Sequence, residues 1–225
     1  METAKKSTRK SSGKVSQDKI VNAYLEYLLS EGKQPATVFK FCLDLGIKEE
    51  EFYDHFGSFD GLEQHIWKRF ADRTVLRLRA DESFVTFSTR EKVLAFYYTL
   101  LEELKSNRSL VLFRLQQVPR LEGLTPTYLK GFKATVEAFF ESILSEGKEN
   151  GEVANRPYLD KRYPQLFGLH LGFILLFWRD DNSAGFEQTD AAVEKSVNLA
   201  FDLIGKSAVD SAIDFGKFLY QTKTR

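Results

Sequence analysis

The stretch GIKEEEFYDHFGS, from Gly46 to Ser58, decides how the first part of the chain folds. Three consecutive carboxylates, Glu49 to Glu51, suit the first turn of a helix, because they favour the positive end of the helix dipole and accept its unpaired N–H groups. Apolar residues follow, and Gly57 ends the pattern. The stretch therefore predicts a short helix over about residues 48–56.

A second short helix precedes this one, over about residues 35–45. Pro35 suits its first turn, where the N–H that proline lacks would have no partner, and Gly46 suits its end. The two helices meet at the four-residue turn LGIK, residues 45–48, which predicts a helix-turn-helix. Before them, from Asp18 to Gly32, apolar residues recur at helical spacing and indicate a first helix.

The rest of the chain also has the apolar period of helices and lacks the sustained alternation of strands. Ser88 or Thr89 suits the N-terminal cap of a helix that begins near residue 89, the fifth in chain order. Further helices are expected over about residues 59–80, 110–118, 126–149, 159–179, 187–204 and 208–220. The prediction is an all-α protein with a basic flexible arm at residues 1–17, a helix-turn-helix domain at 18–62 and a helical body at 63–225.

Composition limits the class of protein. Hydrophobic residues make up 43% of the 225, enough for a sizeable core, and 32 basic residues against 32 acidic ones leave no global basic footprint for nucleic acid. The single cysteine, Cys42, excludes an intramolecular disulfide framework and fits the cytoplasm. The N-terminus lacks the apolar core of a signal peptide, and the most apolar run, residues 166–178, is too short to span a bilayer.

From Ile20 to Trp67 the sequence resembles the tetracycline-repressor family of bacterial regulators. The matching positions are Gly32, Thr37, Val38, Gly46, Ile47, Phe52, Tyr53, His55, Phe56, Gly57, Ser58 and Leu62, in register without gaps. The resemblance implies a three-helix head that binds a double-stranded DNA operator, and a helical body that holds an apolar small-molecule effector. It also implies a homodimer built largely from the last two long helices.

The charge of the expected head departs from the family pattern. Residues 31–62 hold three basic and seven acidic side chains, a balance of −4, whereas phosphate contacts require positive charge. Phe39 and Leu43 stand at positions that are commonly basic or polar in the family, and Phe59 replaces a common lysine. Two interpretations follow. One is a regulator with unusual DNA contacts. The other is a dimer of this fold that has lost DNA binding and binds a lipid-like ligand or a protein, with Phe39, Leu43 and Phe59 on an exposed partner surface.

The first interpretation assigns DNA binding to residues of the head and the arm. These residues are Thr37, Lys40, Lys48, Tyr53 and His55, with Lys10 and Lys14 of the arm. Tyr53 and His55 can donate to phosphates, and an arm of this kind can reach the minor groove.

The segment expected at 159–179 is apolar on two sides, so it needs two partners that bury it. One partner is the core, and the other is a second subunit across a two-fold axis; a fully internal helix of a monomer is the alternative. The residues assigned to the dimer interface are Phe173, Phe177, Val193, Val197 and Phe201.

Aromatic stripes in the body fit a large apolar effector, with the histidine in LFGLHLGFILLFW as a polar group in an otherwise apolar pocket. The residues assigned to this pocket are Phe96, Tyr97, Phe113, Phe139, Phe140 and His170. The alternatives are that the rings are core residues and that His170 is a core histidine bonded to a carbonyl.

The sequence gives little support for an enzyme. It lacks a dinucleotide-binding glycine motif, a phosphate-binding loop and the His-Glu-x-x-His pattern of metalloproteases. Glu51 and His55 lie four residues apart, but two ligands are fewer than a zinc site normally supplies. We therefore expect no cofactor, no metal and no catalytic residues.

Overall fold

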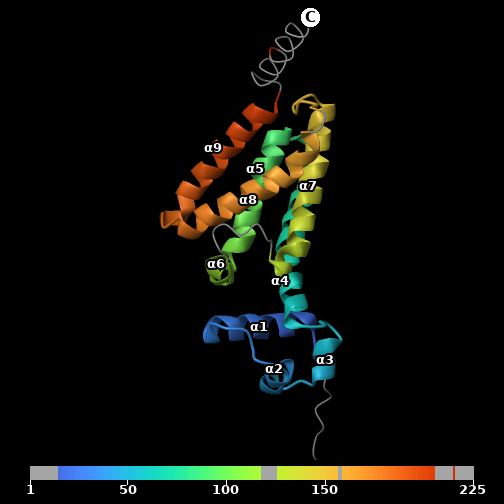
Figure 1. The fold of residues 1–225 in the computed structure, drawn as a ribbon, viewed down its shortest axis with the longest axis vertical. Coiled ribbons are helices and arrows are strands. Elements are labelled where there is room, and N and C mark those ends of the chain that lie inside the picture. The colour runs from blue at the N-terminus through green and yellow to red at the C-terminus, as the bar shows by residue number, and fades with distance from the viewer. Residues whose placement is uncertain (1–14, 118–125, 157–158, 206–214, 216–225) are drawn as a thin grey trace, which may run out of the picture. The chain divides into compact units, whose positions relative to one another are not determined.

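The computed structural model describes residues 15–117, 126–156, 159–205 and 215, and all regular secondary structure in this part of the chain is helical. The residues cluster into two compact units, Met1–Ile66 and Trp67–Arg225. Figure 1 shows the helices of each unit along the colour bar. The predicted all-α class, with a helix-turn-helix head and a helical body, is confirmed.

The first unit, called the head below, contains three complete helices and the start of a fourth. They are α1 (Gln17–Glu31), α2 (Val38–Leu45), α3 (Glu49–Tyr53) and α4 (Phe59–Ala80). The side chain of Thr37 accepts a hydrogen bond from the backbone N–H of Lys40 at 3.1 Å and caps α2. The prediction that Pro35 lies in the first turn of α2 is wrong, because the helix begins only after the Thr37 cap.

One of the three consecutive carboxylates has a structural role. The side chain of Glu51 accepts a hydrogen bond at 3.0 Å from the backbone N–H of Lys48, and the N–H of Glu51 donates to the Lys48 carbonyl at 3.1 Å. This reciprocal pair fixes the start of α3. The helix ends three residues earlier than expected, because the N–H of His55 donates to the Phe52 carbonyl at 3.0 Å and tightens the last turn.

An aromatic cluster forms the core of the head. Phe59 stacks on Tyr24 at 5.4 Å between ring centroids and meets Phe41 and Phe52 edge-on at 5.5 and 5.6 Å. All four side chains are buried. Phe59 is therefore a core residue of the head, and the interpretation that it belongs to an exposed partner surface is wrong.

The second unit is called the body below, and its described residues hold the rest of α4 and five more α-helices. They are α5 (Thr89–Lys105), α6 (Arg108–Gln117), α7 (Lys130–Glu149), α8 (Tyr163–Asp180) and α9 (Glu187–Ile204). Ser88 caps α5 and exchanges hydrogen bonds with Glu91. Helices α7 and α8 begin slightly later than expected, because residues 127–129 and 160–162 form 3₁₀ turns.

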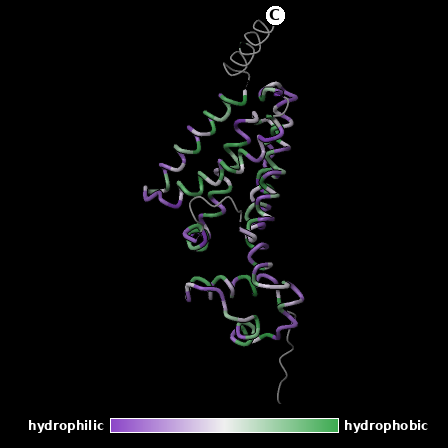
Figure 2. Tube along the Cα trace, in the orientation of Figure 1, coloured by the Kyte–Doolittle hydropathy of each residue, from purple (hydrophilic) through white to green (hydrophobic). Residues whose placement is uncertain are grey.

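Helix α8 packs against both α7 and α9, and α5 packs against the same two helices (Figure 1). Figure 2 shows hydrophobic residues along much of α8. Within the described residues, no helix is long and apolar enough to cross a lipid bilayer. The expected last helix at 208–220 falls almost wholly outside the described residues.

Candidate functional site

The helix-turn-helix exposes four of the residues predicted to bind DNA. Thr37, Lys40 and Lys48 lie at the surface, and Tyr53 is 52% exposed. The oxygen of Thr37 already accepts the capping bond, but its hydroxyl proton can still be donated. These side chains come from both helices of the motif, and each can donate a hydrogen bond to a phosphate oxygen.

His55 is partly buried. Its Nε2 atom lies 2.8 Å from the carbonyl oxygen of Val15, so the imidazole ties Val15, two residues before α1, to the turn that follows α3. Sequence spacing could not reveal this contact, because 40 positions separate the two residues. Lys10 and Lys14 lie outside the described residues.

Two large apolar side chains of α2 face solvent. Phe39 is 62% exposed and Leu43 is 66% exposed. They lie one turn apart, whereas Phe41 and Cys42 of the same helix are buried. The head therefore displays an apolar strip at positions where the family resemblance would place polar or basic residues.

Helix α8 has a buried side and an exposed side, and both are apolar. Phe167, Leu171, Ile174 and Trp178 are at most 3% exposed. The exposed side carries Leu166, Leu169, Phe173 and Phe177, which are 53%, 73%, 51% and 36% exposed. The expectation that one helix carries two apolar sides is confirmed, and the exposed set is called the α8 face below.

The interface prediction for α9 is wrong. Val193, Val197 and Phe201 are at most 4% exposed, because they pack into the core of the same chain. The apolar residues that α9 leaves at the surface are Leu199 (60% exposed) and Leu203 (51%). Helical periodicity located an apolar stripe correctly but could not show which neighbour covers it.

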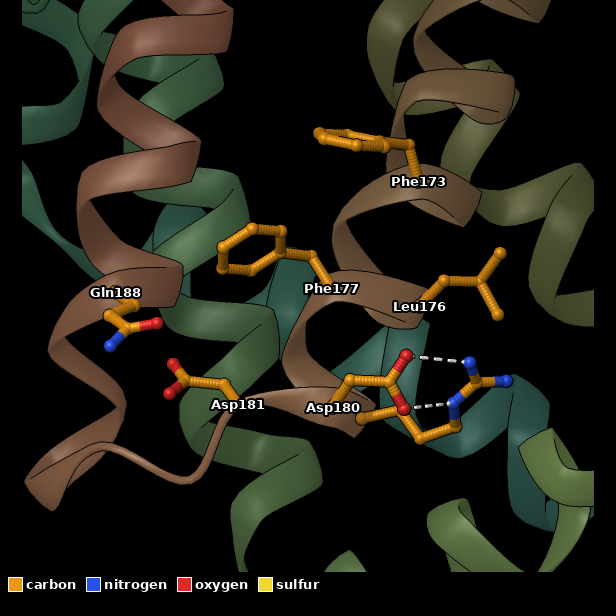
Figure 3. A pocket seen from close by; sticks show the side chains of 7 residues that line it. Phe173, Leu176, Phe177, Asp180, Asp181 and Gln188 are labelled. Atoms are coloured by element: carbon orange, nitrogen blue, oxygen red, sulfur yellow. Dashed lines mark hydrogen bonds and ion pairs between the residues drawn. The ribbon is translucent and has the colours of Figure 1, made fainter.

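A pocket of about 550 Å³ lies at one end of the α8 face. Figure 3 shows Phe173, Leu176 and Phe177 projecting from α8, with Gln188 on α9. Asp180 at the end of α8 pairs with Arg179 through two contacts of 2.7 and 2.8 Å. The surface thus changes from apolar to charged where α8 ends.

A hydrogen-bonded chain links α5, α8 and α9. His170 Nδ1 lies 2.7 Å from the Tyr97 hydroxyl, and His170 Nε2 lies 2.8 Å from Ser196 Oγ, whose hydroxyl donates to the Ala192 carbonyl. This pattern fits a neutral imidazole that carries its proton on Nε2. Burial lowers the pKa of His170, which favours the same neutral form. The imidazole also stacks on Phe173 of the α8 face.

The aromatic residues predicted to line a pocket are mostly core residues. Phe96 stacks on Phe139 at 4.8 Å and meets Phe140 edge-on at 4.9 Å, and all three are at most 4% exposed. Tyr97 is fully buried beside them. The prediction that these four rings form a cavity wall is wrong, because they fill the space between α5 and α7 themselves.

The body instead has an apolar groove of about 360 Å³ between α7 and α8. Its lining residues are Leu129, Phe132, Lys133, Val136, Glu137, Gln165, Gly168, Leu169, Leu171, Gly172 and Leu175. Glycines on α8 open this groove, since a Cβ atom built on Gly172 would meet no atom within 4 Å. Leu169 belongs both to the groove and to the α8 face. In the sequence, the only indication of this groove is the pair of glycines in LFGLHLGF, Gly168 and Gly172.

No cluster of three or more histidine, cysteine, aspartate or glutamate side chains is placed to hold a metal in the part of the chain that the structure describes. A helix-turn-helix head joined in one chain to a large helical body defines a class of all-helical, two-unit helix-turn-helix proteins.

Comparison with known proteins identifies the family. Residues 92–219, more than half of the chain, match the model of the tetracyclin repressor-like C-terminal domain. The chain therefore belongs to the tetracycline-repressor family, whose members are transcription regulators and not enzymes. No curated protein matches the chain.

Solved structures share the fold at low sequence identity. A protein of Syntrophomonas wolfei described as a TetR-family transcriptional regulator aligns with a TM-score of 0.66 at 15% identity, over 82% of this chain and 94% of that one. The fatty acid degradation regulator FadR of Bacillus halodurans gives 0.57 at 17%, over 81% and 97%. FadR of Bacillus subtilis, solved in complex with stearoyl-CoA, gives 0.57 at 16%, over 81% and 97%.

Proposed function

We propose that this chain is a homodimeric DNA-binding regulator whose affinity for its operator changes when an apolar small molecule enters the body. The observation that carries the proposal is the capped helix-turn-helix in a chain of the tetracycline-repressor family. The DNA contacts, the dimer and the effector site each rest on a separate feature.

DNA contacts are assigned to Thr37, Lys40, Lys48 and Tyr53, with the basic residues before Val15 as a further source of positive charge. His55 supports the same contacts indirectly, because its bond to Val15 holds the start of α1 beside α3. The acidic balance of the head implies weak non-specific binding to DNA phosphates. Binding to the operator must therefore depend strongly on contacts with the bases and on the shape of the DNA.

The dimer is assigned to the α8 face together with Leu199 and Leu203 of α9. No Asp, Glu, Lys or Arg occurs from Tyr163 to Trp178, so pairing this face with its two-fold copy buries no charge from that segment. Full burial of a leucine or phenylalanine side chain contributes about 1.5–3 kcal/mol. These side chains are between 36% and 73% exposed, so pairing adds part of that amount for each of them on both subunits, against the cost of association.

The effector site is assigned to the groove between α7 and α8. Its volume falls within the usual range of ligand pockets, about 300–1,000 Å³, and it combines apolar walls with a few polar groups. Leu169 borders both the groove and the dimer face, so a ligand in the groove contacts a residue of the interface. The stearoyl-CoA in the Bacillus subtilis FadR structure makes long-chain acyl-CoA the first class to test.

The experiment that tests DNA binding is a salt series with the DNA upstream of the protein's own gene against random DNA of the same length. We expect a specific complex at low salt whose affinity falls as salt rises. Deleting residues 1–14 should weaken this complex and flatten its salt dependence. Equal affinity for both DNAs at every salt concentration would refute the proposal.

Effector binding is tested by titrating stearoyl-CoA into the protein and into its Gly172→Leu variant. The added side chain should fill the groove and abolish binding, since Gly172 has open space around its Cβ position. Ala191→Leu, which adds a leucine on the exposed surface of α9 away from the groove, is the matched control. Equal binding by all three proteins would exclude this groove as the site.

A further inference from the structure

The head carries a groove beside the helix-turn-helix that its DNA-binding role does not explain. The groove measures about 340 Å³ and lies between α2 and the start of α3. Phe39 and Leu43 form one wall, and Cys42 and Ile47 complete the apolar lining. A monomeric surface rarely leaves two large adjacent apolar side chains mainly exposed without a binding partner.

The rim of this groove carries a net negative charge. Lys48, Glu49 and Glu50 line it, which leaves one net negative charge, and Glu51 on the same helix and Asp54 just after it add two more nearby. Glu51 is held in the helix cap, which leaves Glu49 and Glu50 available to a ligand. Burial raises the pKa of the Cys42 thiol, and the charges of Glu49 and Glu51 raise it further, which indicates a negative potential at the floor of the groove.

These charges select among the possible occupants. DNA and anionic membranes both carry negative charge, so Glu49 and Glu50 disfavour them as occupants of the groove itself, although Lys48 at its edge remains available to a phosphate. A basic amphipathic helix has apolar residues at i, i+3 or i+4 to contact Phe39 and Leu43, and flanking lysines or arginines to pair with Glu49 and Glu50. Surface ion pairs are individually weak, so the apolar contacts supply affinity and the charges supply selectivity.

We propose that the groove between α2 and α3 is a docking site for a basic amphipathic helix of a protein partner. The partner would cover α2 and the start of α3, the elements assigned to DNA. Its binding would therefore compete with DNA and regulate the head independently of an effector in the body. This regulatory consequence rests on the proposed DNA binding, whereas the docking itself does not.

The test uses the full-length protein and two labelled 18-residue helical peptides in fluorescence anisotropy. One peptide has leucines at i, i+4, i+7 and i+11 with lysines at the flanking positions, and the other has glutamate in place of every lysine. We expect saturable binding of the lysine peptide that weakens as salt rises, and no binding of the glutamate peptide.

Three variants locate the site. Phe39→Ser combined with Leu43→Ser should weaken the lysine peptide at least tenfold, while Leu29→Ser, at a 44% exposed position of α1, should leave its affinity unchanged. Glu49→Gln combined with Glu50→Gln should also weaken the peptide several-fold, while the cap formed by Glu51 remains. Circular dichroism of each variant verifies that the head stays folded.

The carboxylate variant also separates this proposal from DNA binding. Removing two negative charges should weaken the lysine peptide but strengthen DNA binding, so the two affinities should move in opposite directions. A head that binds the peptide but no DNA would refute the proposed function and leave the docking site standing. The docking proposal is overturned if both peptides bind equally, if neither binds up to about 1 mM, or if the Phe39 and Leu43 substitutions leave peptide affinity unchanged. Phe39-dependent binding to anionic vesicles in place of the peptide would overturn it as well.

Discussion

The head and the body each expose apolar side chains on a helix, but the chemistry around these side chains differs. Phe39 and Leu43 of α2 lie beside Glu49 and Glu50, whereas α8 itself carries no Asp, Glu, Lys or Arg from Tyr163 to Trp178. Similar exposure therefore implies different partners. An uncharged apolar face suits its own two-fold copy, and an apolar strip with an acidic rim suits a basic ligand.

The two units also differ in which of their features follow the family pattern and which are particular to this chain. The aromatic cluster of the head is buried and preserves the helix-turn-helix, while its surface has departed from the usual charge. The body carries no short recognisable motif, yet its surface fits the dimer that the family implies. Fold and surface chemistry must therefore be tested separately in each unit.

The largest expected effect is the loss of stability when a core aromatic residue of the head is removed, compared with the loss at a surface aromatic residue. Phe52→Ala should destabilise the head by about 3–5 kcal/mol, because Phe52 is fully buried and its removal leaves a cavity. Phe39→Ala, at a 62% exposed position, should change stability by less than about 0.5 kcal/mol. Urea unfolding followed by circular dichroism measures both, and equal losses would mean that Phe39 is not a surface residue.

The next effect concerns the α8 face. Leu169→Glu combined with Phe173→Glu should raise the dissociation constant of the dimer at least a hundredfold, about 2.7 kcal/mol, since each subunit would place two carboxylates in an apolar interface. Leu76→Glu on α4 is the control, because Leu76 is 68% exposed and lies outside this face. Sedimentation equilibrium gives both constants. A dimer of unchanged strength in the double variant would assign the interface to another surface.

A smaller effect of opposite sign is expected from filling the groove with one methyl group. Gly172→Ala should stabilise the body by about 0.5–1 kcal/mol, because alanine favours a helix over glycine and its Cβ meets no atom within 4 Å. Gly147→Ala is the counterpart on α7: its Cβ would lie 2.5 Å from the Thr89 hydroxyl oxygen and should destabilise. Thermal unfolding of the two variants should shift in opposite directions, and a common direction would contradict the packing described here.

The smallest expected effect is the pH dependence that His170 contributes. Because burial lowers its pKa in the folded state, the unfolded chain binds more protons just below the ordinary value near 6.5. The stability contributed by neutral His170 is therefore complete above pH 6.5 and is lost as the pH falls towards the folded pKa. Unfolding free energies at pH 7.5 and 5.5 should differ more for the wild type than for His170→Gln. An identical difference in both proteins would remove His170 as the cause.

Sequence reasoning succeeded where local chemistry decides the structure. Helical spacing and capping residues located α1, α4 and α9 nearly to the residue, and the two apolar sides of α8 were read correctly. The start of α2 was misplaced, because Thr37 caps the helix and Pro35 precedes it. A proline and a threonine two residues apart offer competing starts, and only the folded backbone shows which one is used.

The functional surfaces were harder to predict, because they depend on which neighbour covers a stripe. Val193 and Phe201 form an apolar stripe of the kind that an interface needs, yet α5 and α8 of the same chain cover it. Phe96 and Phe140 are aromatic, as the residues that line an apolar pocket often are, but their rings pack against each other. The groove between α7 and α8 comes from missing side chains at glycines, which hydrophobic periodicity does not detect.

The central claim is that two chains, joined through their bodies, place two heads on one operator. Native mass spectrometry of the protein mixed with its upstream DNA duplex tests this claim most directly. We expect a dominant complex of two chains on one duplex, reduced to free protein and free DNA in the Leu169→Glu and Phe173→Glu variant. A single chain per duplex, or no complex with that DNA at low salt, would contradict the account.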